Sequence, residues 1–382
     1  MLKLRISGFK SIDKAELELR NLTLLIGPPD SGKSNTLEAL GLLSFLAYGG
    51  APVDYFRVWS IDAVRNLLLP DAEAEVQLFD VNESRLCKAC VSRQPNAIRV
   101  NASTPETSAT LDFMFSGGLS ISGDALRAAL NLMRIRFYRF FASSFQRNTT
   151  PYHYYPSYSP LNNLKNSNPE LYKMLWENVP IPPRSPNLID ILKHNSEFYE
   201  ITSSLLKNLS GYERVVPVRI PVNGAVIDTL AVEAVAEGLP IPVLIPINLV
   251  AEGILDYLAT LLAVKAALPN QIPRYLPDIV VLEEPEAHIF PYLVKELAEE
   301  IALQTGASDK YVVLSTHNPV TLITLLEKAP LDKIAIYYVH RDRLTLMTKY
   351  YRLSKEDIES LLDMGFNAHL VLEDMLKEKV NK

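Results

Sequence analysis

An eight-residue segment near the start of the chain has the composition of a phosphate-binding loop. Residues 27–34 read Gly-Pro-Pro-Asp-Ser-Gly-Lys-Ser and fit the pattern G-x-x-x-x-G-K-[ST]. In such a loop, backbone N–H groups and the N-terminus of the next helix surround the phosphates. Lys33 would neutralise the β- and γ-phosphates of ATP, and the Ser34 hydroxyl would bind Mg²⁺. The predicted nucleotide-binding residues of this segment are Gly27, Pro28, Pro29, Asp30, Ser31, Gly32, Lys33, Ser34 and Asn35.

Two adjacent carboxylates follow an apolar run in the second half of the chain. The run 280–282 (Val-Val-Leu) has the composition of a buried strand and ends in Glu283 and Glu284. In a P-loop enzyme Glu283 would hold the shell of the Mg²⁺ ion, and Glu284 would orient or deprotonate the attacking water. The pair therefore predicts hydrolysis of ATP with Mg²⁺ as the metal cofactor.

A histidine follows a further apolar run. His317 belongs to the sequence Ser-Thr-His-Asn at 315–318, directly after the strand-like residues 311–314. A histidine at the end of a core strand can donate a hydrogen bond to a γ-phosphate. We therefore predict Glu284 and His317 as the catalytic residues.

The order of these motifs resembles the ABC-type ATPase heads of the SMC, RecF and OLD families. The resemblance is carried by Phe-Lys-Ser at 9–11, by Glu-Glu-Pro-Glu-Ala-His-Ile-Phe-Pro at 283–291 and by Ser-Thr-His-Asn-Pro at 315–319. It is greatest to the OLD-like branch and covers residues 1–120 and 245–325. Pro29 stands where that family usually has asparagine, and Phe290 replaces a second histidine. The resemblance implies an ATP-dependent homodimer, in which each nucleotide site is completed by the other copy.

The resemblance also implies a signature helix shortly before the carboxylate pair. Such a helix usually begins Ser-x-Gly and contacts the γ-phosphate bound to the other subunit. Ala251, Glu252 and Gly253 occupy this place. Ala251 lacks the hydroxyl group, whereas the helix N-terminus can still offer amides to a phosphate. The glutamine-loop residue stays unassigned, because Arg65 and Gln77 both fit that position only loosely.

The elements expected around these motifs indicate an α/β protein, a P-loop NTPase with an ABC-ATPase-like head. Apolar strand-like runs alternate with helix-like segments, which predicts a mostly parallel central sheet covered on both faces, preceded by N-terminal antiparallel strands. The C-terminal part reads as a hairpin followed by helices, the first opened by Ser354 with Asp357 in the capping-box position. The expected strands are 2–6, 15–19, 22–26, 279–282, 311–314, 333–339 and 344–351, and the expected helix before the carboxylates is 254–267.

The middle of the chain has a different composition from the two ends. Prolines, tyrosines and asparagines accumulate there, interrupted by a helix-like stretch around 188–209. We predict a discontinuous ABC-like ATPase core of residues 1–124 and 241–382. Residues 125–240 would form an inserted lobe of one helix and loops rich in proline and tyrosine.

Basic and aromatic side chains are interleaved in residues 125–169, which contain no acidic residue. Cations beside stacking rings suit a single-stranded nucleic acid. Read as a strand, residues 134–138 place Arg134, Arg136 and Tyr138 on one face, free for a ligand. The alternative is a lobe packed through its aromatic rings, whose arginines are solvated or paired with acids elsewhere.

The composition limits the classes of partner and compartment. The net charge of −6, with 48% hydrophobic and 21% charged residues, argues against general attraction to nucleic acid or to acidic membranes. The first residues lack the apolar region of a signal peptide, and no run could span a bilayer, so we expect a cytoplasmic protein without a membrane partner. Cys87 and Cys90 form one C-x-x-C without further zinc ligands, and are expected to be reduced thiols near a sheet.

Three classes of function fit these motifs to different degrees. The first is a Mg²⁺-dependent ATPase whose ATP-driven dimerisation acts on nucleic acid or on an effector partner, as in DNA repair or anti-phage defence. The alternative is an ATP-dependent regulator of a protein partner without nucleic-acid contact. An ATPase subunit of a transporter would normally show L-S-G-G-Q and a clear glutamine loop, which are absent. A nuclease centre of the OLD type is not expected, because Asp342 lacks the second acid of a D-x-D set.

Overall fold

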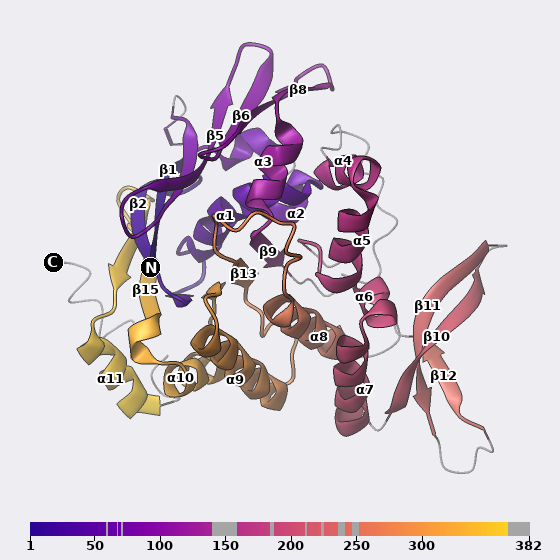
Figure 1. The fold of residues 1–382 in the computed structure, drawn as a ribbon. Helices are drawn as coiled ribbons and strands as arrows, with labels where there is room; N and C mark the ends of the chain where they lie inside the picture. The colour runs from indigo at the N-terminus through magenta and orange to yellow at the C-terminus, as the bar shows by residue number, and fades with distance from the viewer. Residues whose placement is uncertain are drawn as a thin grey trace.

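Two β-sheets and the first long helix between them form the centre of the molecule (Figure 1). The computed structural model of the chain describes residues 1–58, 60–66, 68–69, 72–139, 159–183, 187–210, 212–222, 225–235, 241–246 and 252–365. None of the helices in these ranges combines the length and the apolar character needed to cross a bilayer.

The N-terminal sheet is antiparallel, and its strands follow the order β2-β1-β4-β5-β6-β7-β8. Buried and partly exposed residues alternate along β1, because only one face of this sheet packs against the core. Cys87 and Cys90 both lie on β5 as buried free thiols, as predicted, and burial raises the pKa of each to about 12. The strands are β1 (Leu2–Phe9), β2 (Ile12–Leu19), β4 (Ala74–Phe79), β5 (Arg85–Arg93), β6 (Ala97–Ser103), β7 (Ser108–Met114) and β8 (Leu119–Gly123).

The second sheet has six strands in the order β16-β15-β3-β14-β13-β9. All its neighbouring strands are parallel except β15 and β16. Its central strands are mostly apolar and buried along nearly their whole length, because helices cover both faces of the sheet, as the sequence predicted. The strands are β3 (Leu22–Ile26), β9 (Ile135–Arg139), β13 (Ile279–Glu283), β14 (Tyr311–Ser315), β15 (Ile334–Arg341) and β16 (Thr348–Arg352).

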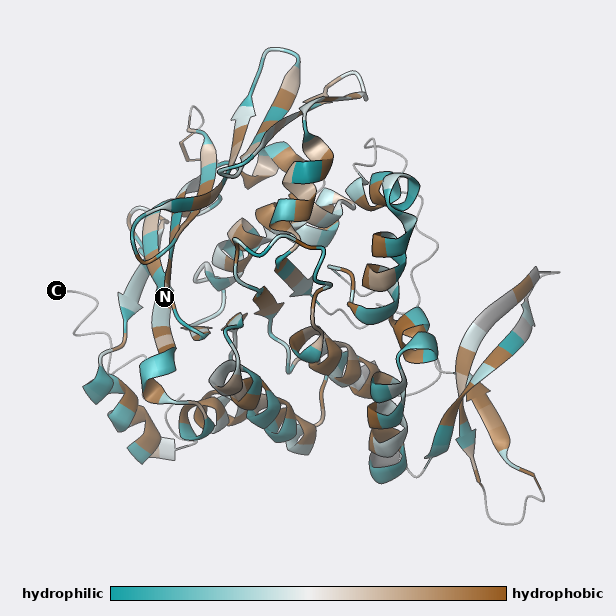
Figure 2. Ribbon diagram, viewed as in Figure 1, coloured by the Kyte–Doolittle hydropathy of each residue, from teal (hydrophilic) through white to brown (hydrophobic). Residues whose placement is uncertain are grey.

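Helices lie on both faces of this parallel sheet. Helix α1 (Lys33–Tyr48) is buried on nearly all sides between the two sheets, with α2 (Pro52–Phe56) and α3 (Ala125–Leu132) beside it. Figure 2 shows apolar stretches along α8 and α9, which pack on the opposite face. The predicted capping box at Ser354 and Asp357 is present. The helices of that face are α8 (Glu252–Lys265), α9 (Pro291–Ala307), α10 (Pro319–Lys328) and α11 (Lys355–Met364), and short 3₁₀ turns lie at Ile61–Val64 and Leu331–Lys333.

The predicted lobe contains more regular structure than the sequence indicated. The single helix expected around 188–209 is two helices, and a three-stranded sheet of order β10-β11-β12 projects beyond them (Figure 1). Pro217 and Pro221 argue against a strand, yet β10 tolerates them because it is an edge strand. The elements are α4 (Pro160–Ser167), α5 (Pro169–Asn178), α6 (Leu188–His194), α7 (Ser196–Ser210), β10 (Tyr212–Val222), β11 (Ala225–Ala234) and β12 (Val243–Pro246).

Strand β9 corrects the predicted boundary between core and lobe. The boundary at residue 125 assigned this strand to the lobe. The structure instead pairs β9 with β13, so that Ile135 lies opposite Ile279 and Arg139 opposite Glu283. The central parallel sheet therefore includes the strand that ends at Arg139.

Candidate functional site

Three neighbouring strands of the parallel sheet end at one place. Strand β3 leads into the loop 27–32, β13 leads to Glu284, and β14, which lies between them, leads to His317. A hollow of about 260 Å³ joins the first and third of these segments. The residues that line it include Gly27, Pro28, Pro29, Thr316, His317, Asn318 and Pro319.

The phosphate-binding loop is fixed at its junction with α1. Gly32 has φ 105°, and a Cβ atom there would lie 2.1 Å from Thr348 Oγ1, so only glycine fits. The same Thr348 hydroxyl is 2.6 Å from Ser11 Oγ, which accepts a hydrogen bond of 2.7 Å from Asn35 Nδ2. The Phe-Lys-Ser segment at 9–11 therefore anchors the start of α1.

Lys33 lies inside the loop that it is predicted to serve. Its side chain is 4% exposed, and Nζ donates to the carbonyls of Gly27 (2.9 Å) and Pro28 (2.8 Å). Burial lowers the pKa of Lys33 to about 8, opposed by the nearby charges of Glu284 and Glu283. The ammonium group is thus held at the position where phosphate oxygens would enter.

The other residues of the loop are placed around this ammonium group. Ser31 Oγ is 3.4 Å from Lys33 Nζ, and Ser34 lies partly buried in the first turn of α1. Asp30 points outward and pairs with Arg341 at 2.8 Å, so its side chain is a structural contact at the loop's edge.

The two predicted catalytic residues are in contact. His317 Nε2 lies 3.1 Å from Glu284 Oε1, and both side chains are partly exposed. The hydrogen bond from His317 is the main cause that lowers the pKa of Glu284, assisted by the charges of Lys33 and Arg57. Glu284 also has the positive φ of 43°, which is rare for a residue with a Cβ atom, and its N–H binds the Ser315 carbonyl at 3.2 Å. The carboxylate is therefore ionised and held in one orientation.

Glu283 is bound by two arginines that sequence reasoning missed. Its Oε2 accepts a hydrogen bond from Arg139 Nε, and its Oε1 lies 3.7 Å from Arg57 Nη1. Both guanidinium groups also bind Glu38, a fully buried carboxylate of α1. One signal was available in the sequence: Glu38 is an acid in an otherwise apolar helix, and a buried charge requires partners.

Part of the chain matches a known protein family. Residues 164–323 match the profile of a family described as "AAA domain, putative AbiEii toxin, Type IV TA system". The matched range is less than half of the chain and contains Glu283, Glu284 and His317, but not the phosphate-binding loop. No curated protein matches the chain.

The chain also resembles solved structures of SMC heads. It is 14% identical to an Smc head bound to the C-winged helix domain of ScpA, with a TM-score of 0.49 and coverage of 93% of this chain and 98% of the other. It is 16% identical to a Pyrococcus furiosus Smc head with an extended coiled coil, bound to the C-terminal domain of ScpA (TM-score 0.49, coverage 95% and 99%). The SMC head domain from Thermotoga maritima is 12% identical (TM-score 0.38, coverage 92% and 98%).

The arrangement of the P-loop, the carboxylate pair and His317 on neighbouring parallel strands decides the type of fold. This chain has the fold of an ABC-type ATPase head. The OLD-like branch within that group stays a prediction.

The predicted signature region of the head is described only in part. Ala251 lies outside the described residues, and α8 begins at Glu252. At Gly253 a Cβ atom would lie 2.2 Å from the carbonyl oxygen of His288, so the first turn of α8 packs directly on the loop after the carboxylate pair. The helix predicted from the resemblance therefore begins beside the candidate site.

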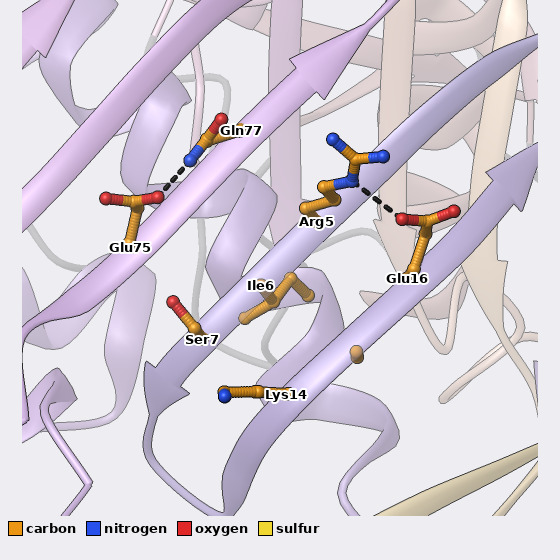
Figure 3. A pocket seen from close by; sticks show the side chains of 8 residues that line it. Arg5, Ile6, Ser7, Lys14, Glu16, Glu75 and Gln77 are labelled. Carbon is orange, nitrogen blue, oxygen red and sulfur yellow. Dashed lines mark hydrogen bonds and ion pairs between the residues drawn. The ribbon is translucent and has the colours of Figure 1, made fainter. Parts of the chain in front are cut away.

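Neither candidate for the glutamine loop gains support in this head. Arg65 Nη1 pairs with Asp62 at 2.9 Å, and its Nε binds the Ala72 carbonyl at 3.2 Å. Gln77 lies on β4 and lines a hollow on the outer face of the N-terminal sheet, beside Arg5 (Figure 3). No residue predicted for the nucleotide site lines that hollow.

Of the two interpretations of residues 134–138, the nucleic-acid face of Arg134, Arg136 and Tyr138 is wrong, and the alternative, in which arginines pair with acids elsewhere, is confirmed for Arg136. Arg136 is fully buried and pairs with Asp278 at 2.8 Å, and Tyr138, also fully buried, donates to the Pro180 carbonyl at 2.6 Å. Arg134 donates to the carbonyls at 272 and 273. The alternation expected for an exposed strand fails, because β9 is covered on both faces by parts of the head. The aromatic residues 140–158 lie outside the described residues.

Glu286 is the one strongly perturbed carboxylate of the block 283–291. Its side chain is almost fully buried, Oε1 accepts a hydrogen bond from Thr316 Oγ1, and Oε2 has no partner. Burial raises the pKa of Glu286 to about 7. The folded head therefore holds this proton more strongly than the unfolded chain, whose carboxyl ionises near the ordinary value of 4.5.

This shift predicts a pH-dependent effect of Glu286→Gln. Because the folded pKa is raised, wild-type stability falls as the pH rises from the unfolded pKa to about 7. When the pH rises from 5.5 to 8, the free energy of unfolding of wild type should fall by about 2 kcal/mol relative to that of the variant, since glutamine mimics the protonated acid at every pH. Urea unfolding at both pH values measures this difference. Glu299→Gln, at an exposed ion pair with Lys328, is the control that should show no such difference, and an equal pH profile for Glu286→Gln and wild type would contradict the prediction.

Proposed function

We propose that this chain binds ATP with Mg²⁺, hydrolyses it, and acts as a homodimer in its ATP-bound form. The observation that carries the proposal is the contact between Glu284 and His317 beside the buried ammonium group of Lys33. A base, a hydrogen-bond donor and a phosphate-binding cation are the groups that hydrolysis of a γ-phosphate requires. Lys33 binds the phosphates, Glu284 accepts the proton of the attacking water, and His317 donates to the γ-phosphate.

Ser34 and Glu283 are the residues that would hold Mg²⁺. A hydroxyl and a carboxylate are hard oxygen ligands of the kind that Mg²⁺ takes. Glu283 fits this role because only one of its two oxygens has a close hydrogen bond. Oε2 accepts a hydrogen bond from Arg139, whereas Oε1 lies 3.7 Å from Arg57 Nη1, which is too long for a good hydrogen bond, so Oε1 can bind the ion. The ion, when bound, neutralises charge on the β- and γ-phosphates.

An exposed aromatic pair beside the site supports dimerisation. Phe290 and Tyr292 are 66% and 48% exposed, and their rings contact each other at 5.3 Å between centroids. They lie at the start of α9, directly after the loop residues His288 and Ile289 on which Gly253 of α8 packs. Exposed aromatic rings are typical of surfaces that another protein covers, and a second copy is the proposed one.

A protein effector is the favoured partner within the described part of the chain. The arginines at 134, 136 and 139, which suggested nucleic acid, are used for internal contacts. The sheet β10-β11-β12 projects from the body and exposes apolar side chains at Val226, Val243 and Leu244. This supports an ATP-dependent regulator of a protein partner, of the kind found in defence systems, over a nucleic-acid enzyme.

Three measurements on the wild-type protein test this proposal. We expect release of phosphate from Mg-ATP, a doubling of the mass in light scattering with a non-hydrolysable ATP analogue and Mg²⁺, and no salt-sensitive binding to DNA or RNA. Absence of both hydrolysis and nucleotide-dependent dimerisation would refute the ATPase switch. Salt-sensitive binding of nucleic acid by the ATP-bound form would instead favour an ATPase that acts on nucleic acid.

A further inference from the structure

Arg139 joins three elements through one buried guanidinium group. Its side chain is 2% exposed, Nε donates to Glu283, Nη1 donates to the Tyr55 carbonyl at 2.9 Å, and Nη2 donates to Glu38 at 2.6 Å. Glu283 ends β13, Glu38 lies on α1, and Arg139 itself ends β9. One side chain thus bridges the carboxylate proposed for Mg²⁺ and the helix that follows the phosphate-binding loop.

The position of this guanidinium group is fixed from several sides. Its Cζ atom lies 5.1 Å from the centroid of the Phe137 ring, and the backbone N–H of Arg139 donates to the Pro183 carbonyl at 3.1 Å. Glu38 is in turn held by Lys10 and Arg57. The network therefore has little freedom to rearrange around Glu283.

We propose that Arg139 is a positioning residue for metal binding, which sets the distance between Glu283 and the start of α1. This role rests on the proposed Mg-ATPase function. Ser34, the other proposed ligand, lies on the same helix as Glu38, one turn before it. By tying Glu283 to Glu38, Arg139 holds the two ligand-bearing elements in register and leaves Oε1 of Glu283, 3.7 Å from Arg57 Nη1, as the oxygen that would bind the ion. Partners of metal ligands of this kind typically change metal affinity by about 10- to 100-fold.

The planar arginine fork suits this task, and a lysine does not. A guanidinium group has five donors in fixed directions, whereas an ammonium group is a point charge on a flexible chain. Arg139→Lys therefore keeps the charge of the network but cannot bridge Glu283, Glu38 and the Tyr55 carbonyl together. This separates positioning from simple neutralisation of charge.

The same strand offers a matched control. Arg136 is also fully buried and pairs with a carboxylate, Asp278, but this acid precedes β13 at the end away from the site. Arg136→Lys disturbs a buried ion pair of the same kind at the opposite end of β13, away from Glu283. It reports the effect of a purely structural change.

The test compares nucleotide affinity with and without metal. The dissociation constant of a non-hydrolysable ATP analogue is measured in Mg²⁺ and in EDTA for wild type, Arg139→Lys, Arg139→Met and Arg136→Lys, with Mn²⁺ electron paramagnetic resonance of the bound complex. We expect the metal-dependent gain in affinity to fall by about 10-fold or more in the Arg139 variants. Affinity in EDTA should stay near wild type, and Arg136→Lys should keep the full gain. If Arg139→Met does not fold, Arg139→Lys decides.

Three outcomes would overturn the role of Arg139. The first is an Arg139→Lys variant whose nucleotide affinity rises with Mg²⁺ as much as that of wild type. The second is an Arg136→Lys variant that loses as much of this metal-dependent gain in affinity as Arg139→Lys does. The third is a wild-type protein that binds nucleotide without any metal gain, which would refute the proposed Mg²⁺ function and this role together. If Mg²⁺ raises the nucleotide affinity of wild type and of Arg136→Lys but not that of the Arg139 variants, the result supports both the Mg²⁺ function and the role of Arg139.

Discussion

Replacement of Glu284 by glutamine is expected to lower the rate of ATP hydrolysis by about 10²- to 10⁴-fold while ATP binding persists. The hydrogen bond from His317 lowers the pKa of Glu284, so the wild-type carboxylate is ionised at neutral pH and can accept a proton from water. The amide of glutamine keeps the shape and can still accept the hydrogen bond from His317, but it is no base. Phosphate release and nucleotide binding, measured on the same sample, separate these two effects.

The Glu284→Gln protein should also accumulate as an ATP-bound dimer. Without hydrolysis, the ATP that favours the closed pair is not consumed, and the population shifts toward that state. Light scattering with saturating Mg-ATP measures the mass. Glu299→Gln, at the exposed ion pair with Lys328, serves as the control and should hydrolyse ATP at the wild-type rate. A monomeric, ATP-saturated Glu284→Gln protein would argue against completion of the site by a second copy.

Loss of the Lys33 ammonium group is expected to weaken ATP binding by a factor on the order of 100 or more. Charge-assisted hydrogen bonds each contribute about 1.5–3 kcal/mol, and this group can donate to both the β- and the γ-phosphate. Titration of Lys33→Ala with a fluorescent ATP analogue measures the change. Lys310→Ala is the matched control: Lys310 is also a mostly buried lysine with a pKa lowered to about 8, but it binds carbonyls at Val264 and Ala266 at the far end of the sheet. Lys310→Ala should lose stability and keep its affinity for ATP.

The pH dependence of ATP binding gives an independent check on Lys33. In the free protein, burial lowers its pKa to about 8, so the ammonium group loses its proton as the pH rises above that value. Since ATP binds the charged form, wild-type affinity should fall between pH 8 and pH 9.5, and the fall should be absent in Lys33→Ala. A wild-type protein with constant affinity over this range, or a fully folded Lys33→Ala variant that binds ATP normally, would contradict the assignment.

Local patterns in the sequence predicted the parts of the site that depend on neighbouring residues. The phosphate-binding loop, the pair Glu283 and Glu284, and His317 each follow an apolar strand, and strand ends of a parallel sheet meet at one edge. Those features need no knowledge of distant contacts. The contact between Glu284 and His317 follows from them directly.

The features that the sequence did not predict depend on partners far along the chain. Residues 134–138 read as a half-exposed strand, but β9 pairs with β13 and is covered on both faces, so Arg136 meets Asp278 in the interior. The bridge from Arg139 to Glu38 likewise joins segments that no local pattern connects. Strand β10 was not predicted because it contains prolines, which a strand tolerates at the edge of a sheet. Its edge position is known only from the order of the strands in the sheet.

The position of β3 between β14 and β15 constrains how the protein can be made. Leu22 lies opposite both Val312 and Ile334, so the strand that precedes the phosphate-binding loop finds its neighbours only after about 290 to 310 further residues have been synthesised. At typical elongation rates the nascent strand waits about 15–60 s for those partners. During that interval a mostly apolar strand has no sheet to join, and a ribosome-bound chain stalled before β14 should be a client for chaperones that shield exposed apolar strands. Nucleotide cannot stabilise such an intermediate, because β14 and His317, which follows it, have not yet emerged.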